Sequence, residues 1–124
     1  MLNEFTLFLM FFAHIADDYY LQGILATLKQ KAWWQRSAPQ KMYRHDYLAA
    51  LIAHAFSWSF MIMLPIALAY GFHGLPRFYG SGLFLNMVIH AVVDHQKANR
   101  GRINLITDQA LHLIQILVTF LCFM

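Results

Sequence analysis

The sequence contains few charged residues and only one cysteine. Charged residues make up 12% of the 124 residues, whereas ordinary globular proteins contain roughly 25%. Hydrophobic residues reach 60% and the mean hydropathy is +0.47, too apolar for the large surface that a small soluble domain exposes. Because Cys122 is alone, an intrachain disulfide and a cysteine metal motif are both excluded. A Gly-rich phosphate loop and a nucleophile elbow are also missing. The composition therefore favours a single membrane domain over residues 1–124.

Apolar stretches predict an all-α fold, a four-transmembrane-helix bundle. About 20 apolar residues are needed to cross the hydrocarbon core of a bilayer. Glu4 stands where a secretory signal peptide would carry a basic residue, so we expect the first segment to be retained. The expected spans are residues 5–28, 47–70, 78–95 and 103–124.

The basic residues indicate an orientation for these spans. Eight of the nine Lys and Arg residues fall in segments 29–46 and 96–102, which four spans would place on one side of the membrane. The positive-inside rule puts both segments in the cytoplasm and both termini outside it. Trp33 and Trp34 suit a first connection that lies at the lipid headgroups. The other aromatic residues, Trp58 among them, are expected to contact lipid rather than to line a cofactor site.

Histidines and aspartates interrupt the apolar stretches at regular intervals. Three His/Asp pairs stand four residues apart, a spacing that puts both side chains on one helix face, and one histidine stands alone. An ionisable group at mid-bilayer costs roughly 2.5–3.5 kcal/mol on insertion scales, so such groups are rarely without a task. With the expected orientation, all seven lie in one layer of the membrane about two helical turns thick. They are His14 with Asp18, His90 with Asp94, Asp108 with His112, and His54; Asp17 is ambiguous.

Imidazole and carboxylate together form the ligand mixture of zinc, iron and manganese sites. The sequence predicts one or two divalent ions held by all seven residues, with Asp18, Asp94 and Asp108 as candidates for a general base. Lys97 and Arg100 are expected to attract a phosphate group, and Gln22 and Gln109 to support the ligands. Two other interpretations stay open: polar residues that hold helices together, and a proton relay.

The run from His14 through Asp18 to Leu21 and Gln22 resembles the opening H-x3-D-x2-LQ signature of the family called domain of unknown function 3307. The resemblance continues through Lys29 or Lys31, His54, the His90-x3-Asp94-x2-Lys97 run and Asp108-Gln109-x2-His112. It covers nearly the whole chain and implies a helical membrane protein of a bacterium or its phage, in the inner membrane, and it favours Asp18 over Asp17. The His and Asp pattern is also faintly similar to membrane-bound metal-dependent hydrolases.

Two hypotheses for function follow. In the first, the protein hydrolyses a lipid or lipid-linked phosphoester at the cytoplasmic leaflet with its bound metal. In the second it is not an enzyme, but an ion or proton conduit or a phage factor that acts on a host membrane partner. The expected partners are the bilayer, anionic phospholipid headgroups, and either a second copy of the chain or a host membrane protein. The basic segments are short and split, so a nucleic-acid surface is not expected.

Overall fold

The computed structural model describes residues 2–124, and this part of the chain is all-helical, without strands. Six α-helices are present: α1 (Leu2–Ile15), α2 (Leu25–Leu28), α3 (Lys31–Ser37), α4 (Asp46–Ala69), α5 (Tyr79–Ala98) and α6 (Leu105–Phe123). A π-helical turn, η1 (Ala16–Leu21), continues α1, and a 3-10 turn, η2 (Lys41–Tyr43), precedes α4.

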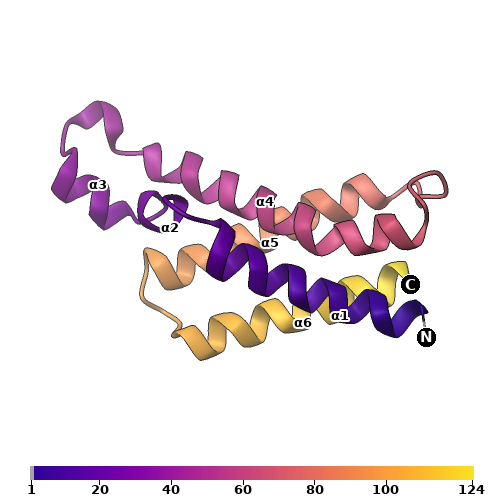
Figure 1. The fold of residues 1–124 in the computed structure, drawn as a ribbon. Coiled ribbons are helices and arrows are strands. Elements are labelled where there is room, and N and C mark those ends of the chain that lie inside the picture. Colours follow the sequence, from indigo (N-terminus) through magenta and orange to yellow (C-terminus); the bar gives the residue numbers. More distant parts are fainter. Residues whose placement is uncertain (1) are drawn as a thin grey trace.

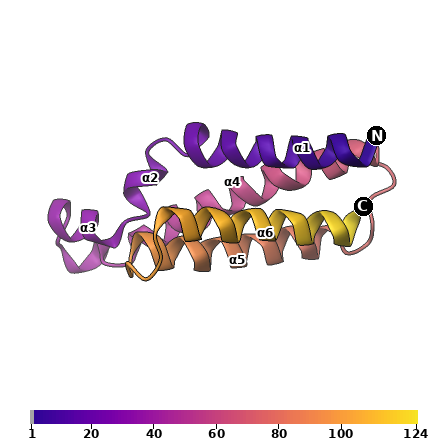
Figure 2. The same cartoon turned by 90° about the horizontal axis from the view of Figure 1, so that it is seen from below.

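The four longer helices lie alongside one another, and the short helices α2 and α3 gather at one end (Figures 1 and 2). Both termini lie at the opposite end, close to the turn between α4 and α5. The two basic connections therefore share one end of the molecule, as the sequence predicts. Helix α4 is central and packs most extensively against α1 and α5.

The first expected span is wrong at its C-terminal end, because the helical path does not continue to residue 28. It ends at Leu21, and Gly23 then adopts a left-handed backbone conformation with φ of 51° before α2 begins. A glycine takes this conformation without the steric penalty of a side chain. The turn brings α2 back against α4.

By length and composition, two segments are suited to crossing a membrane. They are Lys41–Ala69, with a mean hydropathy of 1.8, and Leu105–Phe123, with 1.6. Helices α1 and α5 do not meet the same criterion within the described residues. The structure thus establishes a helical protein with two helices that could span a membrane.

The apolar core occupies the half of the molecule near the termini, where α1, α4 and α6 converge. Its buried members are Met10, Trp58, Ile62, Met63, Ile66, Ile116 and Phe123. Helices α5 and α6 approach closely here, because a Cβ atom on Gly82 would lie 2.4 Å from Cζ of Phe123. Trp58 is completely buried, so the expectation that it contacts lipid is wrong.

A small polar group ties α5 to α6 within this apolar half. The Asn86 carboxamide oxygen accepts hydrogen bonds from Nε2 of Gln115 at 2.8 Å and from Oγ1 of Thr119 at 3.1 Å. The three side chains are buried. These hydrogen bonds join α5 to α6, and the three residues belong to neither group of candidate metal ligands.

Candidate metal centre

The turn η1 brings two consecutive aspartates into the interior. In an α-helix neighbouring residues point about 100° apart, so that two in succession rarely face the same core. The wider π-helical turn, a feature often found at functional sites, buries both Asp17 and Asp18. Asp17 Oδ1 accepts a hydrogen bond from Ser57 Oγ at 2.6 Å, and its Oδ2 lies 3.9 Å from His54 Nδ1. Asp17 therefore borders the cluster.

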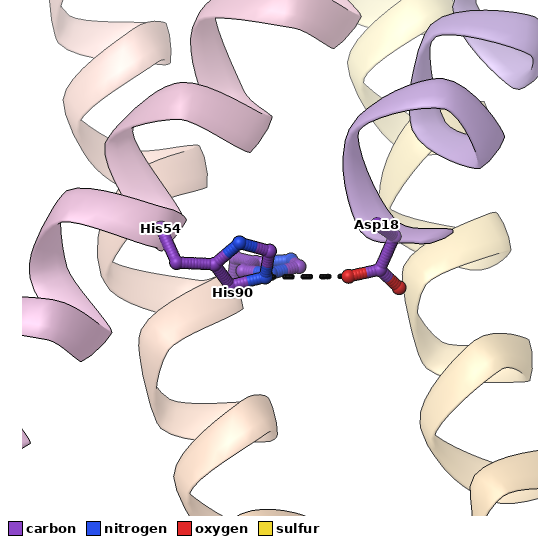
Figure 3. A group of neighbouring side chains, drawn as sticks. All are labelled: Asp18, His54 and His90. Carbon is purple, nitrogen blue, oxygen red and sulfur yellow. Dashed lines mark hydrogen bonds and ion pairs between the residues drawn. The ribbon is translucent and has the colours of Figure 1, made fainter. Parts of the chain in front are cut away.

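Asp18, His54 and His90 form a first group of candidate ligands, from η1, α4 and α5 (Figure 3). His54 Nε2 lies 3.3 Å from Asp18 Oδ1 and forms a hydrogen bond with His90 Nε2 at 3.1 Å, which an ion between these atoms would replace. Two ligand atoms about 2.0–2.2 Å from a four-coordinate ion are about 3.3–3.6 Å apart. The observed spacings are close to this range, so a small shift of the side chains would accommodate a divalent ion.

Asp18, Asp108 and His112 form a second group, in which α6 supplies two of the three ligands. His112 Nε2 lies 3.4 Å from Asp108 Oδ1, and one candidate ligand atom from each residue falls within 4.8 Å of the others. The rings of His90 and His112 stack with centroids 4.1 Å apart, which places the two groups side by side. Asp18 belongs to both.

Several polar atoms of the cluster are buried without a hydrogen-bond partner among the described residues. They are Asp17 Oδ2, His54 Nδ1, His90 Nδ1, Asp108 Oδ1, and both ring nitrogens of His112. A buried polar group left unpaired costs about 1–3 kcal/mol. Asp108 Oδ1 and His112 Nε2, 3.4 Å apart, belong to the second group and are open to a cation, whereas His54 and His90 meet through Nε2 and not through their unpaired Nδ1 atoms. Carboxylate oxygen and imidazole nitrogen both bind a divalent cation, and the residues present fit one.

His14 lies in the cluster, but both of its ring nitrogens are engaged. Nδ1 accepts a hydrogen bond from the Trp58 indole N–H at 2.8 Å. Since the indole only donates, the proton of a neutral ring sits on Nε2, which donates to Gln109 Oε1 at 2.9 Å. The structure thus differs from the expectation that His14 is a ligand, because neither nitrogen is open to a cation. His14 orients Gln109 instead.

Gln109 connects the two carboxylates of the second group. Its Nε2 donates to Asp18 Oδ2 at 2.9 Å and to Asp108 Oδ2 at 3.0 Å. Its Oε1 accepts from His14, so the carboxamide orientation agrees with all three contacts. Gln109 therefore contacts the carboxylates of two candidate ligands, and its role in supporting a metal site stays a prediction.

Two lysines pair with the remaining carboxylate oxygens. Lys29, only 5% exposed, lies 2.7 Å from Asp94 Oδ2 and also donates to Gln22 Oε1 at 2.9 Å. Lys97 donates to Asp108 Oδ2 at 2.8 Å. Asp94 has an ammonium partner and belongs to neither candidate group, although its Oδ2 lies 3.6 Å from His54 Nε2.

With every carboxylate ionised, the formal charges of this cluster do not balance. Four buried carboxylates, those of Asp17, Asp18, Asp94 and Asp108, face the two ammonium groups of Lys29 and Lys97. Four negative charges against two positive ones leave an excess of two when the histidines are neutral. Buried charge is stable only when it is compensated, and one divalent cation supplies the missing amount.

Lys97 and Arg100, predicted to attract phosphate, and Gln22, predicted to support the ligands, occupy different environments. Arg100 is exposed beyond the end of α5. The Lys97 side chain is 26% exposed and forms an ion pair with Asp108. It therefore belongs to the cluster and lies where the cluster meets the surface. Gln22 contacts Lys29 and donates to the backbone carbonyl of Asp18.

Lys29 and Trp58 contact the cluster, although their sequence context predicts contact with solvent and with lipid. Lys29 was grouped with the basic connection, where a lysine normally remains solvated, but α2 carries it inward. Trp58 packs its indole ring on His90, with centroids 4.2 Å apart and planes inclined by 21°. Trp58 follows His54 by four residues, so both lie on one face of α4. This spacing is the sequence signal that Trp58 faces the cluster.

Comparisons of the chain with protein-family models, with curated proteins and with solved structures found no match. The resemblance to domain of unknown function 3307 therefore stays a prediction based on its short motifs. Any function assigned to the chain has to be argued from the cluster itself.

Proposed function

We propose that the protein is a membrane-embedded, metal-dependent hydrolase that cleaves a phosphoester of a lipid or lipid-linked substrate. The observation that carries the proposal is the convergence of Asp18, His54, His90, Asp108 and His112 in a buried cluster with more carboxylates than ammonium partners. These five residues are the proposed ligands. Asp18 is common to both groups.

The exterior of the helices supports a location in the bilayer. Large apolar side chains point outward along the length of the bundle; Phe8, Phe12, Ile106 and Leu121 are each between 68% and 80% exposed. Monomeric soluble proteins rarely expose so much contiguous apolar surface. We therefore infer that α1 with η1, and α5, also cross the membrane beside α4 and α6. Their ionisable residues face the interior, as intramembrane charges do.

The orientation follows from the end of the molecule that carries the basic residues. Segments 29–46 and 96–102 hold eight of the nine Lys and Arg residues, and we assign this end to the cytoplasm. The His/Asp cluster lies toward the same end, since Asp18, Asp94 and Asp108 are near the basic-end termini of their helices. A substrate headgroup in the inner leaflet would be at a comparable depth.

The chemistry proposed for the cluster is addition of water to phosphorus. Asp18, His54, His90, Asp108 and His112 would hold the ion, which would supply a water of lowered pKa and a positive charge beside a phosphoryl oxygen. A carboxylate of the cluster that does not bind the ion accepts a proton from the water as the water oxygen bonds to phosphorus. The ester P–O bond then breaks, and the departing alkoxide takes that proton to become an alcohol. Lys97, at the edge of the cluster, donates to an anionic phosphate oxygen.

The alternative, a proton or ion conduit, has less support from the fold. A conduit needs polar groups through the whole thickness, but the half of the bundle near the termini is filled by the apolar core around Trp58, Ile62 and Met63. The Asn86 side chain in that half forms hydrogen bonds with Gln115 and Thr119, neither of which is an acid or a histidine. The apolar core would interrupt a chain of protonatable groups.

Metal analysis of the purified protein tests the proposal directly. Protein extracted without a chelator should contain one or two equivalents of zinc, manganese or iron, and the His54→Asn variant should contain less. His73→Asn is the matched control, because His73 is exposed in the turn between α4 and α5. A wild-type protein with less than about a tenth of an ion per chain would contradict the metal assignment. Turnover of phospholipid in proteoliposomes, without dissipation of a pH gradient, separates hydrolase from conduit.

A further inference from the structure

A cleft opens between the π-helical end of the first helix and α6. It has a volume of about 470 Å³ and is lined by His14, Ile15, Tyr19, Tyr20, Gln109 and Leu113. Ligand pockets in proteins usually measure roughly 300–1,000 Å³, so the cleft can hold part of a small molecule. Helices α1 and α6 pack against each other much less extensively than α4 packs against α1 or α5.

The inner wall of this cleft is the hydrogen-bond network that holds the metal ligands. Gln109 lines the cleft and donates to the carboxylates of Asp18 and Asp108 on its other side. His14, also in the wall, fixes the Gln109 carboxamide. One side chain thus separates the cleft from the proposed ligands, and a rotation of Gln109 would open the way to them.

The outer rim of the cleft is apolar and aromatic. Ile15 and Leu113 are 47% and 41% exposed, and Tyr19 and Tyr20 are 54% and 79% exposed. Tyrosines with exposed rings are enriched where the headgroups of a bilayer meet its hydrocarbon core. The cleft therefore faces the surrounding lipid sideways at the depth of the glycerol and phosphate groups, rather than facing water along the bundle axis.

We propose that this cleft is a lateral portal through which a phospholipid-type amphiphile enters the metal centre from the bilayer. The inference rests on the proposed function and names its substrate class: a molecule with an anionic phosphoester head and at least one long hydrocarbon chain. The head passes Gln109 to reach the cluster, where Lys97 complements its charge. The chain remains outside, in contact with Ile15 and Leu113, so that it never leaves an apolar environment.

A second groove, between α5 and α6, does not suit this role. It is lined by Leu85, Ile89, Ile114 and other apolar residues around Asn86, in the half of the bundle that holds the apolar core. None of the proposed metal ligands lines it. A lipid in this groove would label α5 as well as α6, whereas the cleft is lined by the first helix, η1 and α6, so the two grooves give different labelling results.

Photolabelling of the intact protein tests the portal independently of catalysis. The probe is a phosphatidic acid with a diazirine near the head, incorporated in phosphatidylcholine vesicles with the reconstituted protein. We expect labelled peptides from residues 15–20 and 109–113. The Leu113→Trp variant, which fills the cleft, should reduce this labelling about tenfold. Leu117→Trp, one turn further along α6 and also 41% exposed, should leave it unchanged. Labelling centred on the groove between α5 and α6, or equal in both variants, would overturn the portal.

Turnover measurements distinguish failure of the portal from failure of the proposed function. If Leu113→Trp retains wild-type metal content but loses hydrolysis of long-chain phospholipid, the portal is supported. If it retains both, the portal is wrong and the hydrolase assignment stands. If the portal is labelled as expected but the metal-loaded wild type hydrolyses no phosphoester lipid, the hydrolase assignment is wrong and the cleft remains a lipid-binding site.

Discussion

Replacing Asp18 by asparagine should remove the bound metal more completely than any other single change in the cluster. Asp18 is the one residue shared by the two ligand groups, and asparagine preserves its shape while removing its charge. The loss also reduces the excess negative charge of the cluster from two to one. Two unit charges about 4 Å apart interact by about 4 kcal/mol at an effective dielectric constant of about 20, and the divalent ion doubles this figure. Even half of that total weakens binding about a thousandfold.

Isothermal titration of the detergent-solubilised protein with zinc or manganese measures this effect, and elemental analysis gives the stoichiometry. Asp46→Asn is the matched control, because Asp46 lies at the start of α4, outside the cluster. His14→Gln should weaken binding only about 10–100-fold, the range for residues that orient ligands, since its ring nitrogens are already engaged. Wild-type affinity and stoichiometry in folded Asp18→Asn protein would refute the assignment of this residue as a shared ligand.

Three further predictions concern stability. The Lys29→Met variant leaves Asp94 buried without its ammonium partner and should lose about 3–5 kcal/mol of unfolding free energy, measured by denaturant titration; the double variant Lys29→Met/Asp94→Asn should recover part of the loss, and an additive result would count against the pair. Gly82→Ala should cost about 1–3 kcal/mol through overpacking against Phe123, whereas Gly80→Ala, whose Cβ meets nothing within 4 Å, should be close to neutral in the same assay; equal effects would contradict the close approach. Removing metal with a chelator should lower the unfolding temperature, since an ion at about 100 times its Kd stabilises a fold by about 2.7 kcal/mol; an unchanged transition would argue against binding to the folded state.

The pattern of the sequence was informative where a residue's neighbours on the same helix determine its surroundings. Apolar periodicity and basic connections predicted an all-helical chain with the basic segments at one end. The four-residue spacing of Asp108 and His112 predicted that both face one side, and they do. Membrane crossing by all four long helices remains a proposal, because length and composition qualify only α4, with the turn before it, and α6.

The remaining features depend on tertiary contacts that spacing alone does not encode. Asp17 and Asp18 are consecutive and both buried in a π-helical turn, and Asp17 binds Ser57 on α4. Lys29 has a loop-like sequence context, but its ammonium group lies against Asp94, which is 65 residues away. The role of His14 depends on a tryptophan on α4 and a glutamine on α6. In each case the partner lies on another helix, so the local pattern could not reveal it.

The π-helical turn also makes the cluster sensitive to chain length. Each residue of an α-helix advances the chain by about 100° around the axis, so deleting one residue from α1 while η1 keeps its geometry would rotate all preceding residues by about that angle relative to Asp18. His14 would then leave Trp58 and Gln109, and Met10 would turn out of the apolar core. Substitutions along this helix alter one contact at a time, whereas a one-residue deletion would misalign every contact that α1 makes.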